Sequence, residues 1–149
     1  MTKSVTITLK PQRRLAGIAG ERLPMKAKMV HRCIHVLDLE KSLAFYKRAF
    51  ELDVVRELTR AGGSRKIVYI GNDATDFELE LVWESDRAEP YDNGSDDTHL
   101  AFAVDDIDAA RVLHDEMDCV CHELGRDGIY FIEDPDGCCL EIVPSDLWD

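Results

Sequence analysis

The feature of this sequence that most restricts its fold is an internal repeat, in which residues 29–83 can be laid over residues 97–143. Each copy begins with a His, reaches an Asp seven residues later and ends near a Glu: His31, Asp38 and Glu80 in the first copy, and His99, Asp106 and Glu141 in the second. A repeat of this kind means that one supersecondary unit is used twice. We therefore expect two related modules that share a core.

Each copy carries the pattern of a strand, a helix and three further strands. Alternating residues predict strands over residues 29–37 and 98–104, and the Asp that follows each strand can cap a helix with apolar residues at helical spacing. Three short segments separated by turn sequences then predict the remaining strands of each copy: 53–58, 66–70 and 77–83, and 119–124, 129–132 and 138–143. The predicted fold class is α+β, with two tandem βαβββ modules forming a concave mixed sheet and a cleft.

The predicted organisation is a basic tail over residues 1–28 and one domain over residues 29–149, built from modules 29–86 and 97–145. The tail contains only one acidic residue, and its residues 5–9 alternate in a way that favours an edge strand. We interpret it as an added tail, with an organelle-targeting peptide as the alternative.

Charge and cysteine content exclude several classes of function. The formal net charge of -12 argues against nucleic-acid binding, because phosphate backbones are held by surplus Lys and Arg. No run approaches the roughly 18 apolar residues of a membrane span, so no membrane association is expected. The five cysteines have no disulfide-framework spacing, and no apolar segment marks a secretory signal. We expect reduced thiols in a cytoplasmic protein.

Strand periodicity places four polar residues on one kind of surface. Because side chains alternate along a strand and the apolar neighbours must face the helices, His31, Glu80, His99 and Glu141 all face away from the helices. A single strand His or Glu is more often a hydrogen-bonded or solvated residue than a ligand. Their equivalent positions in both copies favour the hypothesis of a cleft lined by two imidazoles and two carboxylates.

This donor set suits a borderline divalent ion such as Ni, Co, Zn or Fe, with positions left for water or substrate oxygens. A carboxylate beside such an ion can take a proton from carbon while the ion stabilises the resulting enediolate oxygens. The predicted chemistry is therefore Lewis-acid catalysis combined with general-base catalysis.

The same residues resemble glyoxalase I, the lactoylglutathione lyase family of the vicinal oxygen chelate superfamily. The resemblance covers almost all of residues 29–143 and is carried by these segments: Val30-His31, Val36 to Ser42, Phe45-Tyr46, Glu80-Leu81, Thr98 to Ala101, and Glu133 to Gly137 before Leu140-Glu141. The turn at Asp134 to Gly137 is common to much of the superfamily and identifies only the fold. Glu80 is more discriminating, because relatives with other activities carry a different residue there.

The resemblance implies that His31, Glu80, His99 and Glu141 are metal ligands and that Glu141 and Glu80 are the proton-transfer bases. The implied reaction converts the hemithioacetal of methylglyoxal and glutathione to S-lactoylglutathione. Ni is the expected ion, with Co, Zn, Mn and Fe as alternatives. The resemblance also implies a homodimer whose clefts are shared, each taking the first His–Glu pair from one chain and the second pair from its partner.

Departures from the family concern the substrate. The family commonly has Arg in place of His35 and Asn in place of Glu84, and the segment 124–129 is shorter than the family's loop. Candidate substrate-binding residues are His35, Cys33, Glu84 and Arg126, and the thiol is either glutathione or another thiol. His114, on the second predicted helix, is expected to be solvated.

Two other functions compete with the isomerase. One is a different metal enzyme of the superfamily, such as an epimerase, a thiol transferase or a dioxygenase. The other is a metal-free binding protein of the bleomycin-resistance type, against which the intact set of four ligands argues.

Overall fold

A computed structural model describes residues 27–59, 62–94, 98–125 and 128–147. Its elements follow one another in this order: β1 (His31–Val36), α1 (Leu39–Phe50), β2 (Asp53–Thr59), β3 (Arg65–Gly71), β4 (Glu78–Glu84), β5 (Leu100–Val104), α2 (Ile107–Glu116), β6 (Val120–Glu123), β7 (Tyr130–Glu133), β8 (Cys139–Pro144) and the short 3-10 helix η1 (Ser145–Leu147). The edge strand predicted at residues 5–9 lies outside the described residues.

The strands form two four-stranded mixed sheets with the same topology, β1-β4-β3-β2 and β5-β8-β7-β6. In each sheet the first strand of the module pairs in parallel with the last, and the other pairs are antiparallel. An irregularity interrupts the outer pair at the same place in both sheets, between Val54 and Arg56 and between Val120 and His122. The α+β fold with two βαβββ modules is confirmed, although β5 begins one residue after His99.

The two helices begin in the same way. The side chain of Asp38 accepts a hydrogen bond from the backbone N–H of Lys41 at 3.0 Å, and that of Asp106 accepts from Ala109 at 2.9 Å. The backbone angles of the two caps differ by only a few degrees, at φ -128 and ψ 99 against φ -129 and ψ 96. An Asp in this position satisfies a backbone donor at the helix start that has no partner within the helix.

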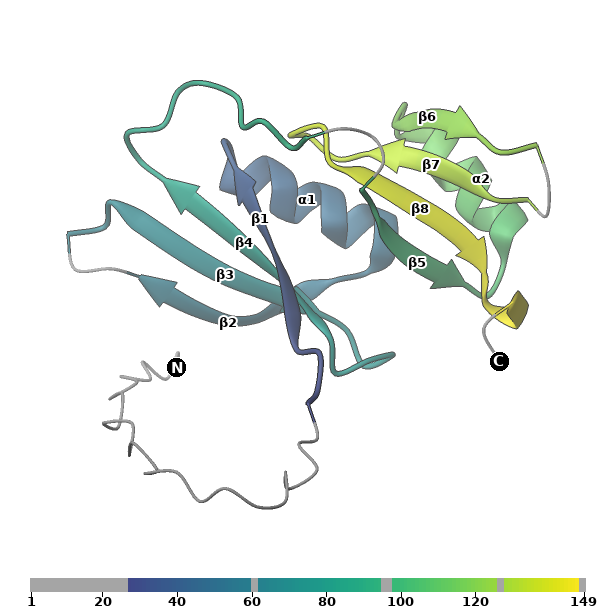
Figure 1. Cartoon of the computed structure of the whole chain (residues 1–149), viewed down its shortest axis with the longest axis horizontal. Coiled ribbons are helices and arrows are strands. Elements are labelled where there is room, and N and C mark those ends of the chain that lie inside the picture. The colour runs from purple at the N-terminus through teal and green to yellow at the C-terminus, as the bar shows by residue number, and fades with distance from the viewer. Residues whose placement is uncertain (1–26, 60–61, 95–97, 126–127, 148–149) are drawn as a thin grey trace, which may run out of the picture.

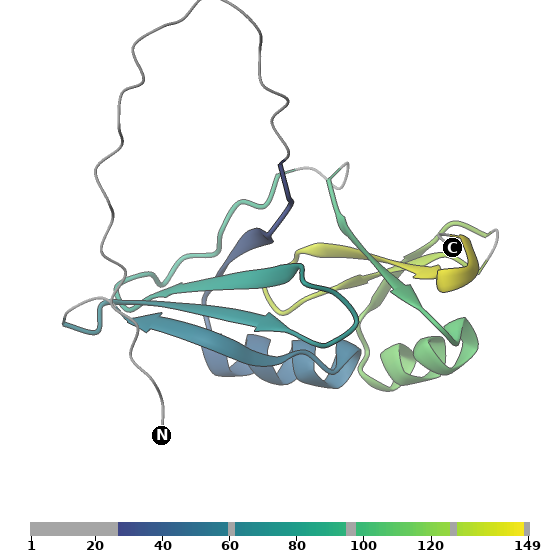
Figure 2. The ribbon, with the colours of Figure 1, turned by 90° about the horizontal axis from the view of Figure 1, so that it is seen from below.

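The modules lie side by side, with α1 and α2 on the same side of the two sheets (Figures 1 and 2). One hydrophobic core joins them, in which Ile34 and Leu81 of the first module belong to the same cluster as Ile132 and Leu140 of the second. No described helix covers the opposite face of either sheet (Figure 2). Polar strand residues that point away from the core therefore line an open face.

The solvated position predicted for His114 is wrong, because this side chain is fully buried between the modules. Its Nδ1 lies 2.8 Å from the Tyr130 hydroxyl, and its Nε2 lies 3.3 Å from the carbonyl oxygen of Ala49 in α1. Burial lowers the pKa of His114, since the charged imidazolium is desolvated. The α2 face that carries His114 packs against β7 and α1, a contact that helical periodicity alone does not reveal.

The turn from Asp134 to Gly137 fastens the second module to the first. One carboxylate oxygen of Asp134 accepts from the backbone N–H groups of Asp136 and Cys138, and the other accepts from the Tyr46 hydroxyl at 2.7 Å. Gly137 has φ +78, a left-handed conformation that favours glycine. The turn thus orients β8, which carries Glu141, by contacts that reach into α1.

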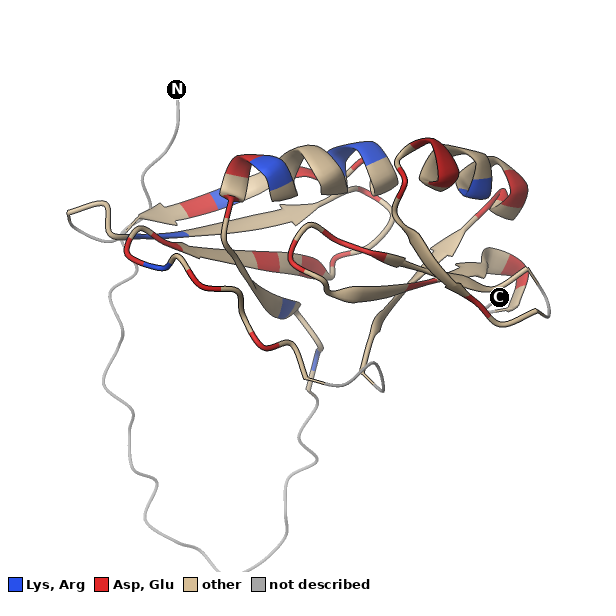
Figure 3. Ribbon diagram, turned by 90° about the horizontal axis from the view of Figure 1, so that it is seen from above, with Lys and Arg blue, Asp and Glu red and all other residues tan. Residues whose placement is uncertain are grey.

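Acidic residues are spread over both modules, whereas Lys and Arg are fewer and include positions on the helices (Figure 3). Among the described residues, no helix combines the length and hydropathy that crossing a membrane would require.

Candidate metal and substrate site

The first predicted ligand pair lies on the open face of the first sheet. His31 starts β1 and Glu80 lies in β4, where the backbone of Glu80 is opposite Cys33. The His31 Nε2 and Glu80 Oε2 atoms are 2.8 Å apart, and the Glu80 side chain is only 12% exposed. One imidazole nitrogen and one carboxylate oxygen therefore meet at a single point of the sheet surface.

The second pair repeats this arrangement on the second sheet. His99 directly precedes β5, and Glu141 of β8 lies opposite Ala101, the residue that corresponds to Cys33. The His99 Nε2 and Glu141 Oε2 atoms are 3.0 Å apart, and the Glu141 side chain is 17% exposed. The equivalence expected from the repeat is therefore present in three dimensions.

An aromatic ring on the adjacent strand supports each pair. Tyr69 is opposite Glu80 in the sheet register and packs edge-on to His31, with ring centroids 5.5 Å apart and planes at 83°. Phe131 is opposite Glu141 and packs edge-on to His99 at 5.4 Å and 84°. The sequence interpretation missed both rings, although Tyr69 and Phe131 lie within the predicted strands 66–70 and 129–132.

The donor set fits a borderline divalent ion, since two imidazoles and two carboxylates are its usual ligands in proteins. Within one chain, however, the four residues do not meet. They form two separate pairs on two sheets, and no group of three or more His, Cys, Asp or Glu side chains suited to a metal occurs among the described residues. A cleft lined by all four, as the repeat suggested, is therefore not formed by a single chain.

The predicted substrate-binding residues are partly gathered on the first sheet. Cys33 and His35 follow His31 on β1, and Glu84 ends β4 with its carboxylate 3.9 Å from the Arg65 guanidinium. Arg126 lies outside the described residues. Three of the four candidates are therefore associated with the open face that carries His31 and Glu80.

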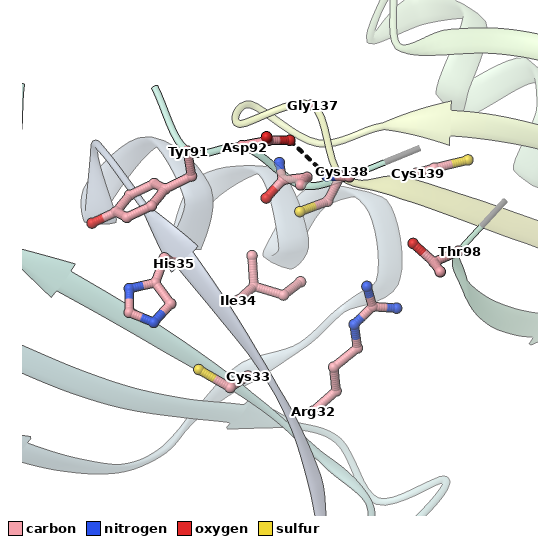
Figure 4. A pocket seen from close by; sticks show the side chains of 12 residues that line it. Arg32, Cys33, Ile34, His35, Tyr91, Asp92, Thr98, Gly137, Cys138 and Cys139 are labelled. Carbon is pink, nitrogen blue, oxygen red and sulfur yellow. Dashed lines mark hydrogen bonds between the residues drawn. The ribbon is translucent and has the colours of Figure 1, made fainter. Parts of the chain in front are cut away.

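Two cavities adjoin these residues. A small one, of about 180 Å³, lies where the segment after β4 crosses β1 and is lined by residues that include Cys33, His35, Tyr91 and Cys139 (Figure 4). A larger one, of about 460 Å³, borders the second pair and is lined by His99, Cys121, His122, Leu124, Phe131, Glu133 and Cys139. Open space therefore adjoins His99 of the second pair and the part of β1 that follows His31.

Known proteins resemble this chain in sequence and fold. The chain is 31% identical over 132 residues to the lactoylglutathione lyase of Neisseria meningitidis, covering 82% of this chain and 94% of that protein. It is 30% identical over 127 residues to the probable lactoylglutathione lyase of Synechocystis, covering 78% and 95%. The trypanothione-dependent glyoxalase I of Leishmania major has the same fold, with a TM-score of 0.72 at 24% identity over 82% of this chain and 89% of that one.

The family assignment follows from the extent of these matches. Residues 28–142 match the sequence model of the Glyoxalase/Bleomycin resistance protein/Dioxygenase superfamily, a range that contains both modules and both His–Glu pairs. The chain belongs to the Glyoxalase/Bleomycin resistance protein/Dioxygenase superfamily.

Proposed function

We propose that this protein is a metal-dependent glyoxalase I-like isomerase, which converts the hemithioacetal of methylglyoxal and glutathione to S-lactoylglutathione. The observation that carries the proposal is the matched pair of His–Glu contacts, at 2.8 and 3.0 Å, at equivalent positions of two sheets. Relatives about 30% identical that are named lactoylglutathione lyase support the same reaction.

In this proposal His31, Glu80, His99 and Glu141 hold one divalent ion, with Ni expected and Co, Zn, Mn or Fe as alternatives. When bound, the ion supplies Lewis acidity that polarises the substrate oxygens. Glu141 removes the proton on C1 of the hemithioacetal, and a carboxylate returns a proton to C2, so the reaction is an isomerisation with no net gain or loss of atoms. The two imidazoles hold their positions through edge-on contacts with Tyr69 and Phe131.

The proposed site is shared between two copies of the chain. Because one chain carries its two pairs on separate sheets, a set of four ligands requires the first pair of one protomer and the second pair of its partner. A two-fold dimer would contain two such sites, since its interface is used twice.

Reconstitution of the metal-free protein tests the function. Ni, Co, Zn and Mn are added separately, metal content is measured, and isomerase activity is assayed with methylglyoxal plus glutathione and methylglyoxal plus other thiols. We expect binding of about one ion per chain and the highest activity with Ni or Co. Failure to bind any of these ions would favour a binding protein, and binding without turnover would favour another metal reaction. His99→Ala should lower metal occupancy, because one strong donor is lost.

Complementation tests the shared site. His31→Ala and Glu141→Ala proteins, both expected to be inactive, are unfolded together in equal amounts and refolded. Random pairing makes about half of the molecules heterodimers, in which one site carries both substitutions and the other carries neither. About one quarter of wild-type activity should return. No recovery, with heterodimers confirmed by mass spectrometry, would mean that the sites are not shared in this way.

A further inference from the structure

The free edge of β1 faces the second module and already binds one carboxylate of the chain. β1 is the last strand of its sheet, because the strand order is β1-β4-β3-β2. Just beyond the end of β1, the backbone N–H of Leu37 donates to Asp136 Oδ1 at 2.9 Å. The other carboxylate oxygen of Asp136 accepts from the Ser42 hydroxyl at 3.3 Å. This edge therefore presents donors that suit an oxyanion.

The alternation of backbone groups directs further donors of β1 to the same edge. The Val30 carbonyl oxygen accepts from the Glu78 N–H at 3.0 Å, so the backbone groups of even-numbered residues point to β4. Those of odd-numbered residues point the other way, as the Leu37 N–H shows. The backbone N–H of Cys33 therefore lies on the free edge, whereas the Cys33 side chain belongs to the open face. Such a donor finds its partner outside its own sheet.

Arg32 adds a positive charge at this edge. Its side chain is half-buried on the core face of β1, where its neighbours Ile34 and Val36 are 4% and 0% exposed. Figure 4 shows the side chain extending toward Thr98 and Cys138 of the second module. Within the described part of the chain, the Arg32 guanidinium has no ion pair or hydrogen bond. Charge-assisted bonds to an oxyanion are the strongest hydrogen bonds that a guanidinium makes.

These donors meet in the small cavity between the modules. The cavity has a volume of about 180 Å³, and its wall contains Arg32, Cys33 and Thr98. Burial and the Asp134 charge raise the pKa of the Cys138 thiol, which also lines the cavity, whereas the Arg32 charge lowers it. The positive charge thus reaches the cavity. Because one water takes about 30 Å³ in the liquid, the cavity has room for one small oxyanion and a few waters.

The carboxylates beside the cavity have other partners. Asp92 lines the cavity, but its side chain accepts from the backbone N–H of Gly94 at 3.0 Å. Asp136 is held by Leu37 and Ser42. The sequence contains 30 acidic residues against 18 basic ones, yet none of the described acids pairs with Arg32. This indicates that the acceptor for Arg32 comes from solution.

We propose that the Arg32 guanidinium, the Thr98 hydroxyl and the free edge of β1 form a binding site for a small oxyanion of the size of inorganic phosphate. The anion contacts β1 and the segment before β5, so it joins the two modules. Arg32 points to the opposite side of β1 from His31, which separates this site from the proposed metal and substrate site. The inference does not depend on the isomerase reaction.

Thermal unfolding of the full chain in increasing inorganic phosphate tests the site, with sodium chloride at matched ionic strength as the reference. A ligand that binds only the folded state stabilises it, so the Tm of the wild type should rise by about 3–6 °C near saturation. Arg32→Gln should lose most of this rise. Arg48→Gln is the matched control, because it makes the same charge change on an exposed residue of α1, and it should keep the rise. Both variants retain the general stabilisation that phosphate gives by exclusion from protein surfaces.

Calorimetry with inorganic phosphate provides a second measurement. About one phosphate should bind per wild-type chain, with at least roughly tenfold weaker binding to Arg32→Gln and unchanged binding to Arg48→Gln. Arg32→Lys keeps the charge but not the planar fork, so its affinity should fall between those of the wild type and Arg32→Gln. If Arg32→Gln does not fold, the comparison of Arg32→Lys with the wild type decides, because equal affinities would overturn the proposal.

A third comparison separates this site from the proposed metal site. Phosphate binding is measured with and without added Ni, because phosphate can also bind a metal ion. Binding without Ni that is lost in Arg32→Gln and kept in Arg48→Gln supports the oxyanion site, whether or not the protein is an isomerase. Binding that requires Ni, or equal Tm rises in the wild type and both variants, would overturn it.

Discussion

The two half-sites, the pairs His31–Glu80 and His99–Glu141, occupy equivalent strand positions but have different neighbouring side chains. Their equivalent rows across the sheet are Arg56, Tyr69 and Glu80 in the first module and His122, Phe131 and Glu141 in the second. The Arg56 guanidinium lies 3.9 Å from the centre of the Tyr69 ring. In the second module, the His122 and Phe131 rings are tilted relative to one another, with centroids 5.9 Å apart. The comparison teaches that the repeat preserves the His–Glu pair while its neighbours have diverged.

The different neighbours restrain the carboxylates of Glu80 and Glu141 to different degrees. Burial raises the pKa of the Tyr69 phenol, as do the charge of Glu80 and a hydrogen bond to it, so Glu80 has a second partner beside His31. Phe131 has no hydroxyl group to offer Glu141. His99, the partner of Glu141, also lines the larger cavity together with Phe131. In the proposed reaction, Glu141 is therefore the carboxylate better suited to move toward the substrate carbon.

The largest expected effect separates the two carboxylates. Glu141→Gln should retain metal but lower kcat by about 10³-fold, because an amide oxygen can coordinate but cannot accept the C1 proton. Glu80→Gln, its matched counterpart, should lower kcat much less at similar metal content. Metal analysis and steady-state kinetics check both variants. Equal losses would show that the two half-sites share the proton transfer.

A smaller effect is expected from exchanging the supporting rings. Phe131→Tyr should give Glu141 the restraint that Glu80 has, and it should lower kcat by about fivefold with KM and metal content unchanged, since one hydrogen bond contributes about 1 kcal/mol. Tyr69→Phe is the reciprocal control and should change kcat by less than about twofold. Kinetics and metal content of both variants are compared with the wild type. Similar changes in both would contradict the difference in restraint.

The smallest effect concerns the helices, where the equivalent residues Tyr46 and His114 both bond into the other module. Only His114 titrates near neutral pH, and its pKa is lowered in the folded state. Above about pH 6.5 it is neutral in both states, but below that value the unfolded chain takes up the proton first, so stability falls. The loss should not exceed about 1.4 kcal/mol per pH unit and should end at the folded-state pKa.

Denaturant unfolding of the wild type and His114→Gln between pH 7.5 and 5 measures this contribution. The variant should be less stable at pH 7.5, and the difference between the two proteins should shrink as the pH falls. Tyr46→Phe is a control that removes one buried hydrogen bond without a titrating imidazole, so its difference from the wild type should stay nearly constant over this range. A constant difference for His114→Gln as well would contradict a neutral, buried imidazole.

Local regularities in the sequence were enough to predict the two βαβββ modules and the members of each His–Glu pair. The second copy repeats three features of the first: the capping Asp, the alternation along β1 and β4, and the spacing from His31 to Asp38. Each of these features depends on contacts between near neighbours in the chain. The His31–Glu80 and His99–Glu141 contacts follow from these patterns, because parallel pairing of the first and last strands brings their open faces into register.

Only the tertiary structure decided how the two modules lie relative to one another. His114 is buried against Ala49 and Tyr130, which lie far from it in the chain. The two His–Glu pairs lie on separate sheets, and Arg65 of β3 lies near Glu84 at the end of β4. The sequence alone could not predict them, because periodicity assigns a side chain to a face of its own helix or strand. Which surface covers that face depends on packing between elements, and this packing has no local signature in the chain.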